Sequence, residues 1–256
     1  MAAETDEEHR AATPDSGKKN GEREAIAICE KLKARHIDST VFVSRSIAEL
    51  EAFLDKQPLA GFDFAGLVGG DGTMHAFINA VLNRYDSVPL PLALFPCGTG
   101  NAFNFDIGCG SIDDTLHCIF ANTTAGIDVA EVNTSNGRLW SFNILGCGLV
   151  AEINRLAENM RWLGASRYTV ASLIKLLSNP SAQLKITTEQ GVLESRFSFV
   201  LACNTRYTGK GMLMAPHAQL NDGKFDVVIV KACSVFKLLR LFPKIFKGGH
   251  LQADVL

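Results

Sequence analysis

Three glycines gathered around one acid form the stretch of this sequence best suited to chemistry, Gly69-Gly70-Asp71-Gly72-Thr73. The apolar run before it fits a buried strand, and the apolar residues after it recur at helical spacing. A strand that turns through glycines into a helix presents several backbone N–H groups at one point. Together with the helix dipole, these groups bind anions, above all phosphate. Asp71, the only carboxylate in the turn, is a candidate proton acceptor; the alternative is a plain turn in which Asp71 caps the helix.

A second glycine turn follows the next apolar strand. Leu90–Phe95 leads into Pro96-Cys97-Gly98-Thr99-Gly100-Asn101. The carboxyl ends of parallel strands lie at the same edge of a sheet, which is where such sheets bind ligands. We therefore expect Gly98 and Gly100 to offer open backbone, and Thr99 a hydroxyl, to a second side of the phosphate chain.

The two motifs together resemble the lipid kinase superfamily that contains diacylglycerol, sphingosine and ceramide kinases. The first motif is shared with NAD kinases and phosphofructokinases. The stretch Glu158–Tyr168 is similar to the sphingosine and ceramide kinase branch. The resemblance covers residues from about Glu22 to the end. It implies ATP-dependent phosphorylation of a hydroxyl on sphingosine, ceramide or diacylglycerol, with Mg²⁺, in a cleft between an α/β domain and a β-sandwich domain.

The resemblance also implies roles for individual residues. Asp71 would accept the proton of the lipid hydroxyl. Glu152 and Asn154 would face the lipid head group, with Asn154 at a position where the sphingosine kinase pattern has an aspartate. Val170, Leu173 and Ile174 would lie on a lipid-gate helix that contacts the membrane, the alternative being ordinary core positions. The residues expected to hold ATP are Gly69, Gly70, Gly72, Thr73, Gly98, Thr99, Gly100, Asn101, Arg161 and Arg167. No protein residue is assigned as a metal ligand.

The sequence departs from the family pattern at both ends. Only Pro14–Gly17 echoes an expected Asn-Pro-x-Ser-Gly loop, and the chain stops at Leu256 before an expected Asp-Gly-Glu. We therefore expect a kinase domain truncated at both ends. Ala76 also stands where sphingosine kinases have a glutamate. A non-catalytic lipid- or nucleotide-binding protein is the alternative function, and an NAD kinase is a further alternative that the Glu158–Tyr168 stretch opposes.

Composition excludes several other classes. Hydrophobic residues make up 47% of the 256 residues and the net charge is −2, which is typical of a globular protein and gives no basic excess for nucleic acid. No apolar stretch is long enough to span a membrane, and the N-terminus lacks a signal peptide pattern. The seven cysteines show no C-x-x-C spacing, so we expect reduced thiols and no metal site. These features predict a cytoplasmic protein, and the family resemblance implies reversible membrane association.

The pattern of elements predicts an α/β domain with a parallel sheet, followed by a β-sandwich-like domain that carries an inserted helical pair. We expect a disordered tail over 1–21, a nucleotide-binding domain over 22–126 and a lipid-binding domain over 127–256, incomplete at its C-terminus. The first helix should bury Ile26, Cys29 and Leu32. The last, Val235–Lys247, is basic and amphipathic, so it faces either the core or a membrane. Further expected elements are a strand at 40–43, helices at 46–54, 111–120, 150–160 and 169–177, and strands at 128–134, 138–145, 182–188, 192–204 and 225–232.

Overall fold

The computed structural model describes residues 21–98, 100–160, 162–163, 167–178, 181–189, 191–208 and 211–252. The side chains of residues 150, 151, 154, 158, 167–169, 173, 176, 177, 251 and 252 lie outside that description. The predicted tail, with its Pro14–Gly17 motif, also lies outside the described residues. None of the described helices is long and apolar enough to cross a bilayer.

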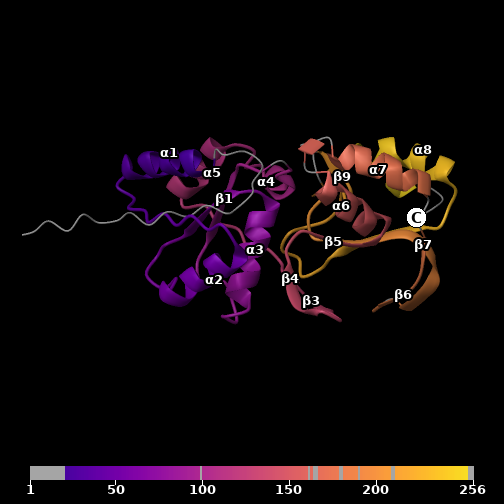
Figure 1. Cartoon of the computed structure of the whole chain (residues 1–256), viewed down its shortest axis with the longest axis horizontal. Coiled ribbons are helices and arrows are strands. Elements are labelled where there is room, and N and C mark those ends of the chain that lie inside the picture. The colour runs from indigo at the N-terminus through magenta and orange to yellow at the C-terminus, as the bar shows by residue number, and fades with distance from the viewer. Residues whose placement is uncertain are drawn as a thin grey trace, which may run out of the picture. The chain divides into compact units, whose positions relative to one another are not determined.

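The elements alternate between helix and strand at first and then become mostly strands (Figure 1). In order they are α1 (Gly21–Lys33), α2 (Ile47–Lys56), β1 (Ala65–Gly69), α3 (Asp71–Leu82), β2 (Leu92–Pro96), α4 (Ala102–Asp106), α5 (Ile112–Phe120), β3 (Ala130–Thr134), β4 (Gly137–Ser141), β5 (Ile144–Gly148), α6 (Leu149–Asn159), α7 (Arg167–Ser178), β6 (Ala182–Thr188), β7 (Gly191–Cys203), β8 (Tyr207–Thr208), β9 (Met212–Leu213), β10 (Asp226–Lys231), α8 (Val235–Ile245) and the 3₁₀ helix η2 (Gly249–Gln252).

The chain forms two compact units. The first comprises the described residues up to Ala125 together with Glu131–Trp140, and the second comprises Gly126–Ala130 with the described residues from Ser141 onward. The chain thus passes between the units more than once near residue 130. The predicted domain boundary at 126/127 stays a prediction.

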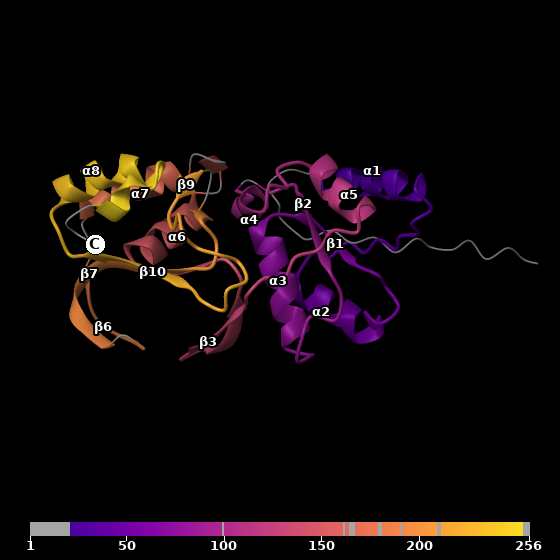
Figure 2. The ribbon, with the colours of Figure 1, turned by 180° about the vertical axis from the view of Figure 1, so that it is seen from behind.

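The first unit is built on a parallel pair of strands. β1 and β2 pair in register from Ala65 with Leu92 to Gly69 with Pro96, so both glycine motifs begin at the same edge of the sheet. Helices α1 and α5 pack on one face, where Val68 and Phe95 are buried against both helices. Helix α3 packs against β1 and α2 against α3 (Figure 2). The α/β domain with a parallel sheet is therefore confirmed.

Several local predictions in this unit need correction. Residues 40–43 form no strand; the Phe42 ring instead stacks on Phe53 of α2 with centroids 4.1 Å apart. Apolar β-formers alone do not make a strand when no neighbouring edge pairs with them. Helix α1 buries Ala25, Ile28 and Leu32. The buried face is therefore shifted by about one residue from the predicted face, which consisted of Ile26, Cys29 and Leu32. Ile26 is 38% exposed.

In the first unit, α2 and α5 each begin directly after a serine that caps the helix. Ser111 Oγ accepts a hydrogen bond from the Asp114 N–H at 3.1 Å, and the Asp114 carboxylate accepts one from the Ser111 N–H at 2.9 Å. This reciprocal capping box fixes the start of α5 and confirms the predicted helix. Ser46 caps α2 by accepting from the Glu49 N–H at 3.1 Å, and the helix predicted at 46–54 is confirmed.

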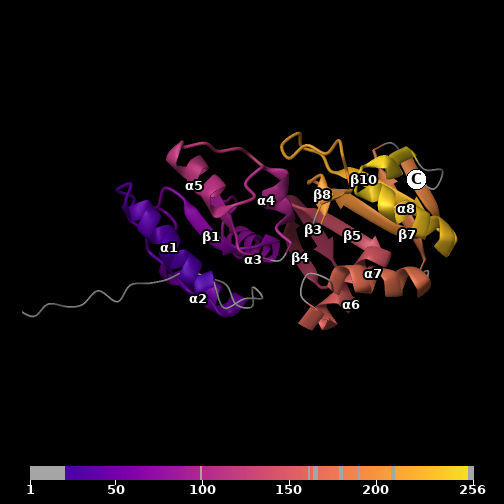
Figure 3. The same cartoon turned by 90° about the horizontal axis from the view of Figure 1, so that it is seen from above.

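The second unit is built on an antiparallel sheet in the order β10-β7-β5, with β6 pairing with the first half of the long strand β7. The predicted strands at 182–188 and 192–204 form β6 and β7, and the hairpin between them closes where Thr188 faces Gly191. Helix α8 buries Leu238, Leu241 and Ile245 against β7 and β10. Helices α7 and α8 lie side by side over the sheet (Figure 3). The sheet-rich domain with an inserted helical pair is confirmed.

Candidate functional site

The two glycine turns contact one another directly. The Gly69 carbonyl accepts hydrogen bonds from the N–H groups of Cys97 at 2.7 Å and of Gly98 at 3.0 Å. A Cβ on Gly98 would lie 2.7 Å from the Gly70 Cα, and a Cβ on Gly70 would lie 3.0 Å from the Gly98 Cα. Neither position has room for a side chain, so the glycines serve to bring the two loops together.

The first loop runs straight into helix α3, which begins at Asp71 rather than after the glycines as expected. The Gly70 N–H lies 3.4 Å from the Thr73 hydroxyl, and a Cβ on Gly69 would overlap that hydroxyl oxygen. Thr73 therefore packs against the turn and fixes its shape. Gly72 is exposed, and a Cβ there would meet nothing within 4 Å.

The start of α3 has the geometry of a potential anion site. The first N–H groups of a helix have no acceptor within the helix, and the dipole of a 12-residue helix places partial positive charge there. The open backbone at Gly72 leaves this end accessible. A phosphate group can therefore approach the main chain at this point without meeting a side chain of Gly72.

Asp71 connects the first loop to the second. Its carboxylate oxygens accept hydrogen bonds from the Ala102 N–H at 2.9 Å and the Phe103 N–H at 3.0 Å. These are the first two N–H groups of the short helix α4, so Asp71 caps a helix other than its own. Each carboxylate oxygen keeps a further lone pair. The geometry gives Asp71 a structural role and leaves its predicted role as a base a prediction.

Asn101 closes the second loop from a left-handed conformation, with φ 49°. Its side-chain Nδ2–H donates to the Gly98 carbonyl at 3.0 Å. Its Oδ1 is buried between Gly70 and Gly98 and has no hydrogen-bond partner among the described residues. A buried acceptor without a donor is costly, so this oxygen is suited to a water, a ligand hydroxyl or a cation.

Sequence reasoning missed several polar side chains that tie together elements of the first unit. Asn104 is fully buried, and its Nδ2–H donates to the Leu94 carbonyl at 2.7 Å; the Thr115 hydroxyl donates to the same carbonyl at 3.1 Å. Asn79 on α3 binds both backbone groups of Trp140, at 2.9 Å and 2.8 Å. An asparagine on an apolar helix face is the signal that could have identified Asn79.

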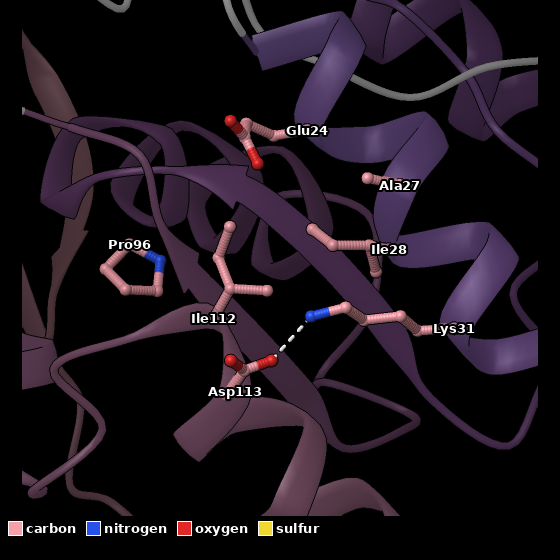
Figure 4. Close-up of a pocket in the computed structure, with 7 residues that line it drawn as sticks. All are labelled: Glu24, Ala27, Ile28, Lys31, Pro96, Ile112 and Asp113. Carbon is pink, nitrogen blue, oxygen red and sulfur yellow. Dashed lines mark hydrogen bonds and ion pairs between the residues drawn. The ribbon is translucent and has the colours of Figure 1, made fainter.

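A pocket of about 370 Å³ lies at the end of β2 on the α1 and α5 side (Figure 4). Ile28 and Ile112 point into it, and the Lys31 ammonium on α1 pairs with Asp113 on α5 at 2.6 Å. The pocket contains none of the predicted ATP-contacting residues. With Glu24 and Asp113 in its lining, it is unfavourable for a phosphate chain.

Apart from Gly100, the remaining predicted residues belong to the second unit or lie outside the described part. Thr99 and Arg161 are not among the described residues, and only the backbone of Arg167, Asn154 and Leu173 is described, at the start of α7, within α6 and within α7 respectively. Val170 is half-buried, whereas Ile174 is 45% exposed. Gly100 lies beside Asp71, since a Cβ there would be 3.7 Å from the Asp71 Oδ2.

Glu152 on α6 pairs with two cations. Its carboxylate lies 2.8 Å from the Arg155 guanidinium and 2.9 Å from the Lys175 ammonium on α7. The hydrogen bond from Lys175 is the main cause of a lowered pKa at Glu152. The side chain is partly exposed, so the network ties α6 to α7 with modest energy. Any positively charged head group would have to compete with these two partners for the carboxylate.

Comparison with known proteins identifies the family. Residues 12–132 match the family described as "Diacylglycerol kinase catalytic domain", and residues 143–256 match "YegS C-terminal NAD kinase beta sandwich-like domain". A diacylglycerol kinase of Mycobacterium tuberculosis (strain H37Rv) is 30% identical over 247 residues, which cover 94% of this chain and 78% of that protein. The chain belongs to the diacylglycerol kinase family of lipid kinases. This kinase is therefore a phosphotransferase, and the predicted superfamily is confirmed.

More distant relatives include lipid kinases of other kinds. Sphingosine kinase 1 of Arabidopsis thaliana is 24% identical to this kinase, with 75% of this chain and 50% of that protein covered. A crystal structure of a diacylglycerol kinase from Bacillus anthracis superposes with a TM-score of 0.72 at 21% identity, covering 99% of this chain and 84% of that one. The likeness shows that the two proteins share a fold.

Proposed function

We propose that this kinase transfers the γ-phosphoryl group of ATP to a lipid hydroxyl at the edge where the two glycine loops meet. The observation that carries the proposal is the direct contact between Gly70 and Gly98 at the start of α3. Phosphoryl transfer requires little covalent chemistry from the protein, so positioning and charge stabilisation dominate. Two loops of open backbone beside a helix N-terminus supply both.

The phosphate chain of ATP would lie against the backbone of Gly69–Thr73 and Gly98–Asn101. The first N–H groups and the dipole of α3 would hold the phosphate oxygens, because the Gly98 N–H already donates to the Gly69 carbonyl. The guanidinium groups of Arg161 and Arg167 would offset charge on the group in transfer, since their planar forks bind two oxygens at once. This role of the two arginines rests on the family resemblance.

Mg²⁺ fits the chemistry of this edge. The described residues contain no cluster of three or more His, Cys, Asp or Glu side chains for a metal. Mg²⁺ commonly keeps several waters and binds through substrate phosphates and one or two protein oxygens. Two kinds of protein oxygen are available here for such an ion. They are the Asn101 Oδ1, which has no partner among the described residues, and the Asp71 carboxylate oxygens, each of which keeps a lone pair. When bound, the ion would neutralise phosphate charge.

Asp71 would accept the proton of the attacking lipid hydroxyl through a lone pair that the α4 N–H groups do not use. Those two hydrogen bonds hold the carboxylate in one position. A base held still by main-chain donors is already oriented for its reaction. The same residue would then align the loops and take the proton.

For the lipid, we propose a neutral head group such as diacylglycerol or ceramide in preference to free sphingosine. Asn154 is neutral where the sphingosine kinase pattern has an aspartate, and the Glu152 carboxylate is already paired with Arg155 and Lys175. A sphingoid ammonium would therefore lack a free carboxylate from these two positions. The head group of diacylglycerol needs none.

The test is transfer of label from γ-labelled ATP to lipid in mixed detergent micelles, with diacylglycerol, ceramide and sphingosine as separate substrates. We expect labelled diacylglycerol or ceramide in excess of labelled sphingosine. ATP binding by calorimetry without any labelled lipid would reject the catalytic proposal and favour a non-catalytic binding protein. A strong preference for sphingosine would reject the head-group proposal alone.

A further inference from the structure

Helix α8 carries apolar side chains on two separate faces. Leu238, Leu241 and Ile245 are 2%, 3% and 6% exposed and pack into the core of the second unit. Phe236 is 84% exposed and Leu239 37% exposed. At about 100° per residue, Leu239 and Phe236 lie roughly 130° and 170° around the helix from the centre of the buried stripe. The core therefore does not account for the whole apolar surface of the helix.

The exposed apolar face continues to the end of the helix. Phe246, at the C-cap, is 47% exposed and follows Phe236 and Leu239 at intervals that keep all three on one side. Its ring makes an edge contact with the ring of Phe242, with centroids 5.9 Å apart. Phe242 is partly buried against the core of the second unit, so this contact packs one side of the Phe246 ring. We name Phe236, Leu239 and Phe246 the outer apolar stripe.

A stripe of positive charge runs beside the outer apolar stripe. Its members recur every three or four residues and all are exposed: Lys237, Arg240, Lys244 and Lys247. Residues 235–247 contain no Asp or Glu. None of these four cations has a carboxylate partner within the described part of the chain. The exposed half of α8 is therefore apolar on one side and uniformly basic on the other.

We propose that this outward face of α8 docks the protein on anionic lipid bilayers. A helix with protruding aromatic side chains and an adjacent row of Lys and Arg has the pattern of an interfacial membrane helix. Each cation near such a surface is attracted by anionic head groups, although the whole chain carries a net charge of −2. The attraction is thus local to this helix. Helix α7, which packs against α8, also has an exposed apolar side chain, Ile174, which is 45% exposed.

The proposal rests on the proposed function only in that a lipid substrate resides in bilayers. Docking positions the second unit against the surface from which a lipid must be drawn. It adds no residue to the phosphate loops, so binding to vesicles and phosphoryl transfer can be measured independently.

The experiment is co-sedimentation of the full chain with vesicles of phosphatidylcholine, with and without phosphatidylserine. Lys244→Gln with Lys247→Gln should lower the partition coefficient on anionic vesicles about 30-fold, since each cation contributes about 1 kcal/mol. Phe236→Ser should lower it about tenfold. Phe236 is so exposed that this substitution should leave the thermal unfolding temperature unchanged.

Matched controls lie on the β6–β7 hairpin and on β6. Val192 is 60% exposed and Lys185 is exposed, so Val192→Ser and Lys185→Gln remove the same chemistry elsewhere on the same unit. Both controls should bind vesicles as the wild type does. Equal losses in the controls and the α8 variants would overturn the proposal, as would unchanged binding by folded α8 variants.

Two further outcomes also decide against the proposal. Failure of the wild type to bind anionic vesicles would overturn it outright. Concentration-dependent dimerisation that Phe236→Ser abolishes, without vesicle binding, would assign the face to a second copy of the chain. Phosphorylation of a lipid in detergent micelles tests the proposed function apart from docking. Vesicle binding without that activity would sustain docking and reject the kinase proposal.

Discussion

Replacing Gly72 with alanine should stabilise the protein and weaken ATP binding at the same time. Gly72 is the second residue of α3, it is exposed, and a Cβ there meets nothing within 4 Å. Alanine is favoured over glycine in a helix and reduces the entropy of the unfolded chain, which together add about 0.4–1 kcal/mol to the free energy of unfolding. The unfolding temperature should therefore rise by roughly 1–4 °C.

The same methyl group would occupy the space through which a phosphate approaches the α3 N-terminus. Crowding of this kind costs about 1–3 kcal/mol, so the Kd for ATP should rise roughly 5- to 150-fold. Isothermal titration calorimetry measures the Kd, and differential scanning calorimetry of the same preparation measures stability. The stability of the variant should therefore rise while its affinity for ATP falls.

Gly110→Ala is the matched control, because a Cβ at Gly110 also meets nothing within 4 Å. That variant should bind ATP as the wild type does. A stable Gly72→Ala variant with unchanged ATP affinity would refute the reasoning, since it would show that phosphate does not contact this backbone. A Gly72→Ala variant less stable than the wild type would contradict the placement of residue 72 in an open first turn of α3.

Three other variants test separate parts of the account. Gly98→Ala should lower the free energy of unfolding by about 1–3 kcal/mol in chemical denaturation and reduce ATP binding, because its Cβ would lie 2.7 Å from the Gly70 Cα; a folded variant with normal affinity would contradict this. Burial lowers the pKa of His250, so the folded state keeps it neutral, and stability present above about pH 6.5 should be lost as the pH falls below that value. His250→Gln should flatten the pH dependence of urea unfolding between about pH 7.5 and 5.5, and an unchanged slope in this variant would exclude His250. Asn154→Asp should raise phosphorylation of sphingosine relative to diacylglycerol, and an unchanged ratio would remove Asn154 from head-group selection.

The phosphate loops could be predicted from sequence because their chemistry is local. Glycines that follow an apolar strand and precede a helical pattern specify a turn into a helix N-terminus. The cap that Asp71 provides to α4 could not be predicted in the same way. It joins residues 31 and 32 positions apart, and α4 is a five-residue helix with no periodic signal. The predicted strand at 40–43 was wrong because propensity does not supply a pairing partner.

Helix α8 shows the same division between local and tertiary information. Its sequence established a basic amphipathic helix and left two readings, a core helix and a membrane contact. The structure shows a buried stripe and, on a different face, exposed Phe236 and Leu239. Amphipathic periodicity specifies how apolar residues are spaced along a helix. Which of them the rest of the fold covers depends on packing against β7 and β10, which spacing alone does not contain.

The most direct test of the central account measures Asp71→Asn in three assays on one preparation: lipid phosphorylation, ATP affinity and thermal unfolding. Asparagine retains one acceptor oxygen for the α4 N–H groups but cannot take a proton at neutral pH. The account predicts a fall in kcat of about 10²-fold or more with ATP affinity largely retained. Turnover equal to the wild type in a folded variant would contradict the assignment of the reaction to this site. Parallel loss of stability, ATP binding and turnover would show that Asp71 only holds the loops together.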